Sequence, residues 1–212
     1  MTRSQKIQYL IKEVIDKAFA FLFIVVLSPL LLIASISIKL DSKGPIIFKQ
    51  KRLGRNGKPF TIYKFRTMVD NAEKMGSGIF TSKNDNRITR VGKILRKTSI
   101  DELPQLINIL KGEMSFIGPR PPLVHHPYRY EDYDETQILR FSILPGITGY
   151  AQAYARNSIK WPERIKMDVY YYRNFSLWFD LKIFIKTILT IITSKGTYSD
   201  RNKLKKLYSC RE

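Results

Sequence analysis

Two adjacent carboxylates, Asp101 and Glu102, are the side chains of this sequence best placed to do chemistry. They follow a dense run of cations, and Pro104 comes shortly after them, so the pair is held at the junction of two segments. Carboxylates that face cations can bind a divalent metal ion, and a phosphate can bridge that ion and an arginine. A carboxylate can also attack phosphorus and form an acyl phosphate. The alternative is an acidic helix start with Ser99 or Asp101 as the N-cap. The preceding cations are Arg87, Arg90, Lys93, Arg96 and Lys97.

Two further segments present cations on a stiff or extended backbone. Proline on both sides of Arg120 fixes the backbone there, so the guanidinium group loses little entropy when it binds a phosphate. The alternative is a rigid surface loop with an exposed arginine. Residues 62–68 alternate as a strand does, which puts Lys64 and Arg66 on one basic face. The alternative for this strand is a solvated sheet edge.

A glycine-containing segment, residues 145–149, is the last candidate for ligand contact. Its glycines permit the backbone to approach a ligand closely. Gln152 and Arg156 follow it and add an amide and a charge. Taken alone, the segment indicates only a tight turn.

The overall composition points to an anionic partner. The chain has 212 residues, with 37 Lys and Arg against 18 Asp and Glu, and a net charge of +19. Nucleic acid, an anionic membrane surface and phosphorylated small molecules all fit this charge. A hydrophobic content of 44% excludes a fully disordered chain. The single cysteine, Cys210, excludes an internal disulfide. Because the only histidines are the adjacent His125 and His126, these three residues cannot form a zinc site.

An uncharged apolar run covers residues 18–38, with a lysine at each end. A straight helix of this length would be roughly 30 Å long and could cross a bilayer core. However, Ser28-Pro29 lies in the middle, where proline kinks a helix. Both flanks are basic, which favours the same side of the membrane for both. We therefore expect a re-entrant hairpin of two half-helices. A spanning helix, a signal peptide and a buried core helix are the alternatives.

The remaining chain mixes strand and helix patterns and predicts an α+β fold. We expect three regions: a membrane hairpin with its lead-in over 1–40, a catalytic domain over 41–195 and a basic tail over 196–212. The apolar segment 177–193 could lie on the membrane, pack against the first helix or be a core helix. The predicted elements are an amphipathic lead-in helix over 3–17, a β-hairpin of 46–52 and 59–66, and helices over 91–97, 103–111, part of 123–141, 159–175 and 177–193.

The order of these motifs resembles the bacterial sugar transferase family, the monotopic phosphoglycosyl transferases, and among them the small members that consist of the catalytic domain alone. The resemblance runs from about residue 8 to about residue 195. The segments that carry it are the apolar run with Ser-Pro, KFRTM, DELPQL after a basic helix, GEMSFIGPRP, PGITGYAQ and DVYYYRN.

This resemblance implies a reaction. Family members transfer a phosphosugar from a nucleotide-activated sugar, usually a UDP-sugar, to a polyprenol phosphate such as undecaprenyl phosphate, and release UMP. By this likeness Asp101 is the nucleophile of a covalent phosphosugar intermediate. Glu102 supports a Mg²⁺ site together with Asp101. Arg96 and Arg120 match family residues that contact phosphate.

The resemblance also implies the surroundings of the site. Ser28-Pro29 matches the break of a re-entrant helix, which places the enzyme on the cytoplasmic face of the bacterial inner membrane, in contact with lipids. Tyr150-Ala-Gln152 stands where many members have Leu-Ala-Gln, so the sugar or uridine contacts of Gln152 and Arg156 stay open. No nucleic acid partner is expected, and a homodimer through 177–193 is conceivable. The alternatives are a membrane-anchored basic module without catalysis and a metal-dependent hydrolase of lipid diphosphates.

Overall fold

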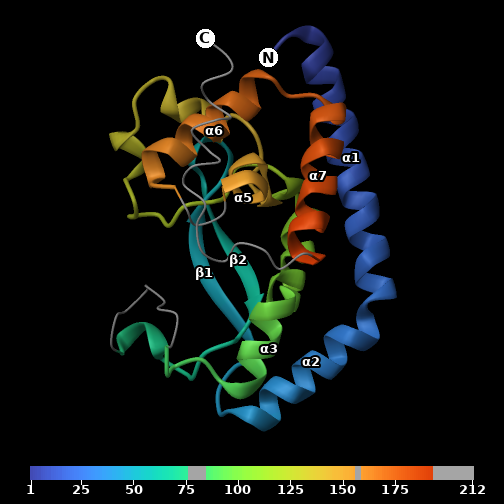
Figure 1. The fold of residues 1–212 in the computed structure, drawn as a ribbon, viewed down its shortest axis with the longest axis vertical. Coiled ribbons are helices and arrows are strands. Elements are labelled where there is room, and N and C mark those ends of the chain that lie inside the picture. The colour runs from blue at the N-terminus through green and yellow to red at the C-terminus, as the bar shows by residue number, and fades with distance from the viewer. Residues whose placement is uncertain (76–84, 156–158, 193–212) are drawn as a thin grey trace.

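A bent pair of helices forms one long edge of the molecule (Figure 1). In this computed structural model, which describes residues 1–75, 85–155 and 159–192, α1 (Arg3–Val26) and α2 (Ser28–Asp41) meet at Leu27 with a bend of 63°. The Ser28 hydroxyl donates to the Val25 carbonyl at 2.8 Å. Pro29 lies in the first turn of α2, where a missing N–H costs little. The bend therefore falls where the sequence predicts it.

The arms of this pair differ from the expected hairpin. The amphipathic lead-in is not a separate element, because α1 continues through it as one helix of 24 residues. Extending an existing helix is cheaper than nucleating a second one, which explains the continuity. The chain turns by 63° and does not double back on itself. No single helix in the described residues is long and apolar enough to cross a membrane, whereas this bent pair passes that test when its two helices are taken together.

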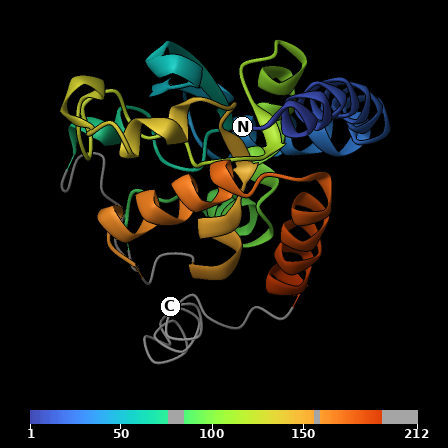
Figure 2. The ribbon, with the colours of Figure 1, turned by 90° about the horizontal axis from the view of Figure 1, so that it is seen from above.

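Buried polar contacts attach α1 to the rest of the molecule. The Lys12 ammonium lies 2.8 Å from the Asp180 carboxylate of α7 (Leu177–Ile192). The Ser115 hydroxyl donates to the Asp16 carboxylate at 2.6 Å. Figures 1 and 2 both place α7 beside α1. Because these charges are paired, the cost of removing them from water is offset.

An antiparallel hairpin of β1 (Ile47–Leu53) and β2 (Pro59–Phe65) runs through the middle of the molecule (Figure 1). The turn between the strands puts Asn56 at φ 55° and Gly57 at φ 71°, a region that these two residue types tolerate best. This confirms the predicted hairpin, with strand ends shifted by about one residue.

The outer edge of β2 is covered by the short helix α4 (Leu106–Leu110). The Asn108 side chain accepts a hydrogen bond from the Tyr63 N–H at 3.1 Å and donates one to the Thr61 carbonyl at 2.7 Å. The edge groups are thus paired by an amide that imitates a neighbouring strand. Leu106 and Ile109 of the same helix pack with Ala20 of α1 and form one of the cores.

Some of the other predicted helices differ from the structure in their bounds or in their helix type. The prediction over 103–111 is wrong in its first part, because Pro104 lies in a 3₁₀ helix, η3 (Ile100–Gln105), that precedes α4. Residues 123–141 contain 3₁₀ turns and no α-helix, since three prolines in 119–122 hold their entry extended. The predicted basic tail over 196–212 lies outside the described residues. The remaining helices are α3 (Arg90–Thr98), α5 (Tyr150–Ala155) and α6 (Trp161–Arg173).

A second, parallel sheet joins two segments that the sequence predicts only as rigid turns. β3 (Ser115–Ile117) pairs with β4 (Gly146–Thr148). The pairing continues past the strand end, where the Gly118 N–H donates to the Thr148 carbonyl at 2.9 Å. A side chain at Gly149 would collide with the Gly118 carbonyl, so glycine is required for this approach.

Candidate active site

A sharp reversal between two helices presents the carboxylate pair. α3 ends at Thr98, and Ser99 takes the left-handed conformation with φ 59°. η3 starts directly after it, so Asp101 and Glu102 occupy its first turn. Both side chains are part-buried. The pair therefore sits on a short, fixed segment and not on a mobile loop.

Glu102 lies among cations from two other elements. The Lys64 ammonium of β2 lies 2.6 Å from its carboxylate, and the Arg120 guanidinium lies 4.0 Å from it. Burial alone would raise the pKa of Glu102, but Lys64 and Arg120 outweigh it, and the pKa is lowered. Glu102 is thus a carboxylate at neutral pH.

Asp101 has the opposite electrostatic character. Burial and the neighbouring charge of Glu102 raise its pKa to about 6, against the opposing effects of Lys64 and Arg96. Two adjacent carboxylates with pKa values pushed apart are typical of acid, base or nucleophile pairs in active sites. Near neutral pH, Asp101 is mostly ionised but poorly solvated, which suits a nucleophile.

Arg96 reaches the site because α3 docks closely on the end of β2. Its Nε donates to the Thr67 hydroxyl at 2.8 Å. A Cβ atom at Gly92 would collide with the Thr67 carbonyl, so glycine lets the helix approach the strand. Arg96 is thereby held where its charge acts on Asp101.

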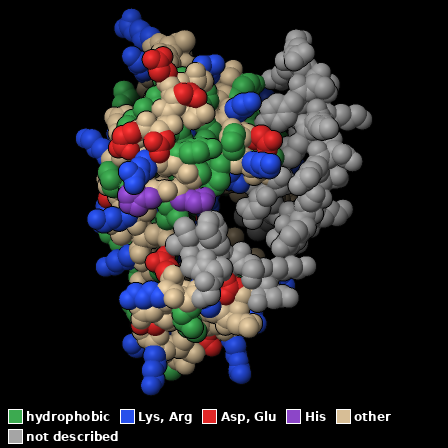
Figure 3. Space-filling view, turned by 90° about the vertical axis from the view of Figure 1, so that its left-hand side faces the viewer, with side chains coloured by type: hydrophobic (Ala, Val, Ile, Leu, Met, Phe, Trp, Pro, Cys, Tyr) green, Lys and Arg blue, Asp and Glu red, His purple; other side chains and the backbone are tan. Residues whose placement is uncertain are grey.

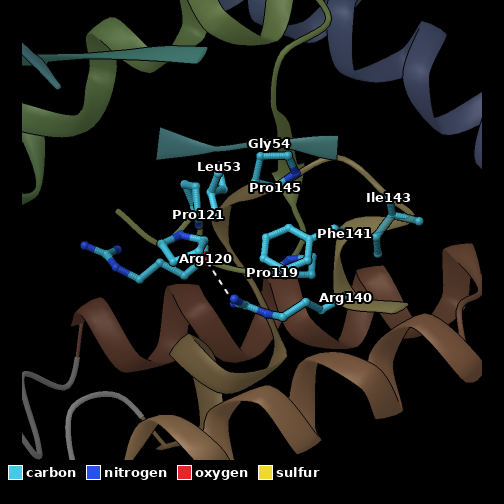
Figure 4. A pocket seen from close by; sticks show the side chains of 10 residues that line it. Leu53, Gly54, Pro119, Arg120, Pro121, Arg140, Phe141, Ile143 and Pro145 are labelled. Atoms are coloured by element: carbon cyan, nitrogen blue, oxygen red, sulfur yellow. Dashed lines mark hydrogen bonds between the residues drawn. The ribbon is translucent and has the colours of Figure 1, made fainter. Parts of the chain in front are cut away.

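Two arginines hold the loop that carries Arg120: the buried Arg140, whose bond to Arg120 is drawn in Figure 4, and the part-buried Arg52. Arg140 donates to the Arg120 carbonyl at 3.0 Å and is itself held by Asp168, at 2.7 Å from Nη2 and 3.1 Å from Nε. Arg52 donates to the Pro121 carbonyl at 3.2 Å. The cavity behind the loop has a volume of about 10 Å³, room for about one water molecule. The loop is thus packed from behind, and the Arg120 side chain remains 38% exposed.

The sequence reasoning missed these three supporting residues. Neither Arg52 nor Arg140 stands in a motif that indicates a role at the site. Asp168 stands in DVYYYRN, a segment used for the resemblance, so that motif offered the one available hint. Burial, and after it the repulsion of Arg120, lower the pKa of Arg52 to about 10.

Two of the other predicted ligand-binding residues, Arg66 and Gln152, form no hydrogen bond or ion pair with the carboxylate pair. Arg66 is buried, and its guanidinium group donates to the Ser42 carbonyl at 2.8 Å and to the Lys43 carbonyl. It joins the end of β2 to the end of α2. Gln152 lies in α5 with both amide atoms buried and without hydrogen-bond partners among the described residues. Arg156 lies outside the described residues. Phosphate contact by Arg66 and sugar or uridine contact by Gln152 stay predictions.

The carboxylate pair is also where a metal ion would bind. In the described parts of the chain, no three His, Cys, Asp or Glu side chains come together as a metal site. Mg²⁺ needs no such cluster, because it is commonly held by one or two carboxylates and by substrate phosphates. The donor set of Asp101 and Glu102 fits that ion and suits neither structural zinc nor calcium.

Comparison with known proteins gives consistent matches. The family model for bacterial sugar transferases matches residues 7–194. A UDP-N-acetylgalactosamine-undecaprenyl-phosphate N-acetylgalactosaminephosphotransferase of Aeromonas hydrophila is 44% identical over 189 residues, which cover 88% of this chain and 44% of that protein. A UDP-glucose:undecaprenyl-phosphate glucose-1-phosphate transferase of Escherichia coli is 40% identical over 89% of this chain and 42% of its own length.

A third relative has a length close to that of the present chain. The uncharacterized sugar transferase EpsL of Bacillus subtilis is 40% identical over 187 residues, which cover 88% of this chain and 90% of that protein. Against the Aeromonas and Escherichia proteins, the chain spans less than half of their length.

Proposed function

The chain belongs to the bacterial sugar transferase family, and we propose that it is a phosphoglycosyl transferase. Its donor is a UDP-sugar, its acceptor is a polyprenol phosphate of the undecaprenyl type, and its by-product is UMP. The names of the relatives support this choice of donor and acceptor. The reaction would start the assembly of a membrane-bound glycoconjugate.

One observation carries the proposal: a part-buried carboxylate with a raised pKa lies beside a charge-paired carboxylate, and cations from three elements surround both. Lys64 comes from β2, Arg96 from α3 and Arg120 from the loop after β3. Negative charge that develops on phosphate oxygens finds fixed positive partners here, with little reorganisation. A simple anion-binding module has no use for a poorly solvated carboxylate among those cations.

The chemistry balances in two half-reactions. A carboxylate oxygen of Asp101 attacks the phosphorus that bears the sugar, the bond from this phosphorus to the bridging oxygen breaks, and UMP leaves with the electron pair. In the second step, an ionised oxygen of the acceptor phosphate attacks the same phosphorus. The bond to Asp101 breaks, and the carboxylate is restored. Lys64, Arg96 and Arg120 hold the phosphate oxygens in both steps.

We propose Mg²⁺ as the cofactor, with Asp101 and Glu102 as its protein ligands. When bound, the ion would neutralise part of the diphosphate charge of the donor. Glu102 is suited to this role because its lowered pKa keeps it ionised.

Membrane association is supported by the inverted polarity of α1 and α7. In α1 the charged Lys12 and Asp16 face the protein interior, and Asp180 does the same in α7. Large apolar side chains point outward in both helices, a pattern that water disfavours and an apolar phase stabilises. The opposite face of the molecule carries Lys and Arg side chains along its whole length (Figure 3). The outward apolar side chains include Leu10, Val14, Phe21, Val26, Trp178 and Leu189.

These features favour a monotopic protein on the cytoplasmic face of the inner membrane. The bend of 63° at Leu27 would let the helix pair enter the bilayer and leave on the same side. Asp101 would then work at the level of the lipid phosphates.

The proposal is tested by UMP release from a panel of UDP-sugars, with Mg²⁺ and undecaprenyl phosphate. We expect at least one UDP-sugar to give UMP and a lipid-linked product with the unaltered protein. Asp101→Asn should abolish both, because the amide cannot attack phosphorus. UMP release at an undiminished rate in this variant would refute the assignment of the nucleophile. Free sugar phosphate in place of lipid product would indicate a hydrolase.

A further inference from the structure

A cavity of about 390 Å³ lies on the hairpin, on the face opposite to the carboxylate pair. Tyr63 lines it, whereas the next residue, Lys64, contacts Glu102. Successive side chains of a strand point to opposite faces, so the cavity is a separate site. We infer that it binds an anionic glycerophospholipid, with the lipid phosphate at two lysines and the glycerol ester region against an apolar wall. The inference rests on the proposed membrane association and involves no step of the transfer reaction.

Two lysines from different elements give the cavity its charge. Lys49 projects from β1, opposite Tyr63 in the hairpin register. Lys111 directly follows α4, and its ammonium donates to the Tyr63 hydroxyl at 2.9 Å. This bond raises the pKa of Lys111 and leaves two of its three N–H groups for a ligand. Among the described residues, no carboxylate lines the cavity, so it favours an anion.

The surroundings of Lys111 keep this end of the cavity positive. A Cβ atom at Gly112 would lie 3.6 Å from the Lys17 ammonium of α1, so a third lysine comes close to the residue that follows Lys111. The carboxylate of Glu113 also acts on Lys111, but it lies outside the lining and accepts a hydrogen bond from Asn108 at 2.7 Å. A phosphate at Lys111 therefore meets more positive than negative side chains.

The position of Lys17 relates the cavity to the level of the lipid headgroups. Lys17 is the last charged residue before the uncharged run 18–38, so it marks where α1 would enter the hydrocarbon. The other flank of the cavity lies near α2: Ile47, at the end of the hairpin nearest α2 (Figure 1), packs on the core that includes Ile38. The cavity thus lies between segments that pack on both arms of the helix pair, where lipid phosphates would be found.

The remaining lining is apolar and continues along α4. It consists of Pro45, Ile47, Pro104 and Ile107. Ile107 is 44% exposed, and Leu110, three residues later, is 36% exposed. Residues three apart share one face of a helix, so an apolar strip leads away from the lysines. A phospholipid presents a phosphate and then apolar chains in the same order.

The chemistry of the lining favours an anionic lipid over other phosphates. A choline headgroup would bring a cation beside the two lysines, where like charges repel. A free phosphate would leave the apolar wall uncovered. A polyprenol phosphate must reach Asp101 to react, and in the described part of the chain the cavity includes no residue of the carboxylate pair. Anionic phospholipids supply a negative phosphate at the membrane surface itself.

The binding test uses the full chain in a non-ionic detergent, with dihexanoyl phosphatidylglycerol as the soluble probe. The thermal unfolding temperature should rise with the probe concentration, because a ligand of the folded state stabilises it, and this rise gives an apparent Kd. Dihexanoyl phosphatidylcholine, glycerol 3-phosphate and farnesyl phosphate should each raise the unfolding temperature less at the same concentration.

Charge variants locate the binding at the cavity. In Lys49→Glu with Lys111→Glu the apparent Kd should rise by roughly tenfold or more, because two charge-assisted contacts become repulsive. Both side chains are exposed, so the fold should be retained. Lys49→Arg with Lys111→Arg keeps both charges and should bind the probe more tightly than the Glu pair does. Lys58→Glu with Lys166→Glu, also exposed, makes the same change in net charge outside the cavity and should leave the Kd within about twofold.

Each outcome decides a separate point. An unchanged Kd in the variant with glutamates at the cavity, or an equal rise in the control variant, would overturn the inference. So would stabilisation as large as that by phosphatidylglycerol from glycerol 3-phosphate, from phosphatidylcholine or from farnesyl phosphate, which would assign the cavity to a free phosphate, to an uncharged contact or to a prenyl phosphate. The test uses no turnover, so a failure to release UMP from any UDP-sugar would refute the proposed function and leave this result standing.

Discussion

Asp101 and Glu102 share one turn of chain but differ in protonation behaviour because their surroundings differ. Lys64 lies 2.6 Å from Glu102 and helps to lower its pKa, whereas burial and the Glu102 charge raise the pKa of Asp101 to about 6. Separate roles for two identical functional groups follow from this difference. Glu102 remains an ion, and Asp101 becomes ionised just below neutral pH.

The rate of the first half-reaction should therefore depend on pH. Only ionised Asp101 can attack, so kcat/KM for the UDP-sugar should rise with pH and level off above a midpoint near pH 6. UMP release is measured without acceptor, because a phosphate monoester also titrates at about pH 6. Glu102→Gln removes the neighbouring negative charge and should move the midpoint to lower pH. A profile that is flat from about pH 5 to about pH 8 would contradict this account.

At the scale of the elements, the loop with Arg120 depends on a buried ion pair below it. Arg140 and Asp168 are almost completely buried, and Arg140 also holds the Arg120 carbonyl. Removing one partner of such a pair leaves an uncompensated buried charge. The stability of the protein and the placement of Arg120 are therefore coupled.

We expect Arg140→Met to lower the free energy of unfolding by about 3–5 kcal/mol. Adding Asp168→Leu should recover much of this loss, because the orphaned carboxylate is removed as well. Lys166→Met, an exposed change on the same helix as Asp168, should stay within about 0.5 kcal/mol. Denaturant titration in a mild detergent measures all three. An Arg140→Met variant as stable as the unaltered protein would show that the pair does not hold the loop.

Elements with local signals were predictable from the sequence. Asn56-Gly57 indicates the hairpin turn, and Ser28-Pro29 indicates the break between α1 and α2. The parallel pairing of β3 with β4 was not predictable, because strands of three residues carry no readable period. Their partners are also distant in the chain, and parallel pairing leaves no turn motif.

The residues of the active site divide in the same way, into those with a local sequence signal and those without one. Asp101, Glu102 and Arg120 stand in recognisable motifs. The support from Arg140 depends on contacts between distant segments, which local patterns do not encode. Arg66 illustrates the limit of strand alternation: β2 ends at Phe65, so the rule that puts Lys64 and Arg66 on one face stops applying between them.

The whole molecule has a distinct apolar side formed by α1 and α7 and a charged side opposite (Figures 1 and 3). This division fits a protein that rests on a membrane and reacts at its surface. It also fits the inward position of two charged residues of α1, Lys12 and Asp16, since Lys12 is paired with Asp180 and would lie away from the proposed apolar phase.

The topology can be tested with single cysteines at positions 4 and 58, in a chain that also carries Cys210→Ser. A reagent that cannot cross membranes should label both positions only from the cytoplasmic side. Pro29→Ala should let α1 and α2 merge, and part of position 4 should then label from the other side. Pro45→Ala, which lies outside the apolar run, is the matched control and should change nothing. Labels in opposite compartments for the unaltered bend would refute a monotopic arrangement.

The most direct test of the whole account is the intact mass of the protein after exposure to its UDP-sugar and Mg²⁺ in the absence of acceptor. We predict an increase by the mass of one phosphosugar, located by fragmentation at Asp101, absent in Asp101→Asn and removed when undecaprenyl phosphate is added. An unchanged mass while UMP is formed only in the presence of acceptor would mean direct transfer without an aspartyl intermediate, and would contradict the role given to Asp101.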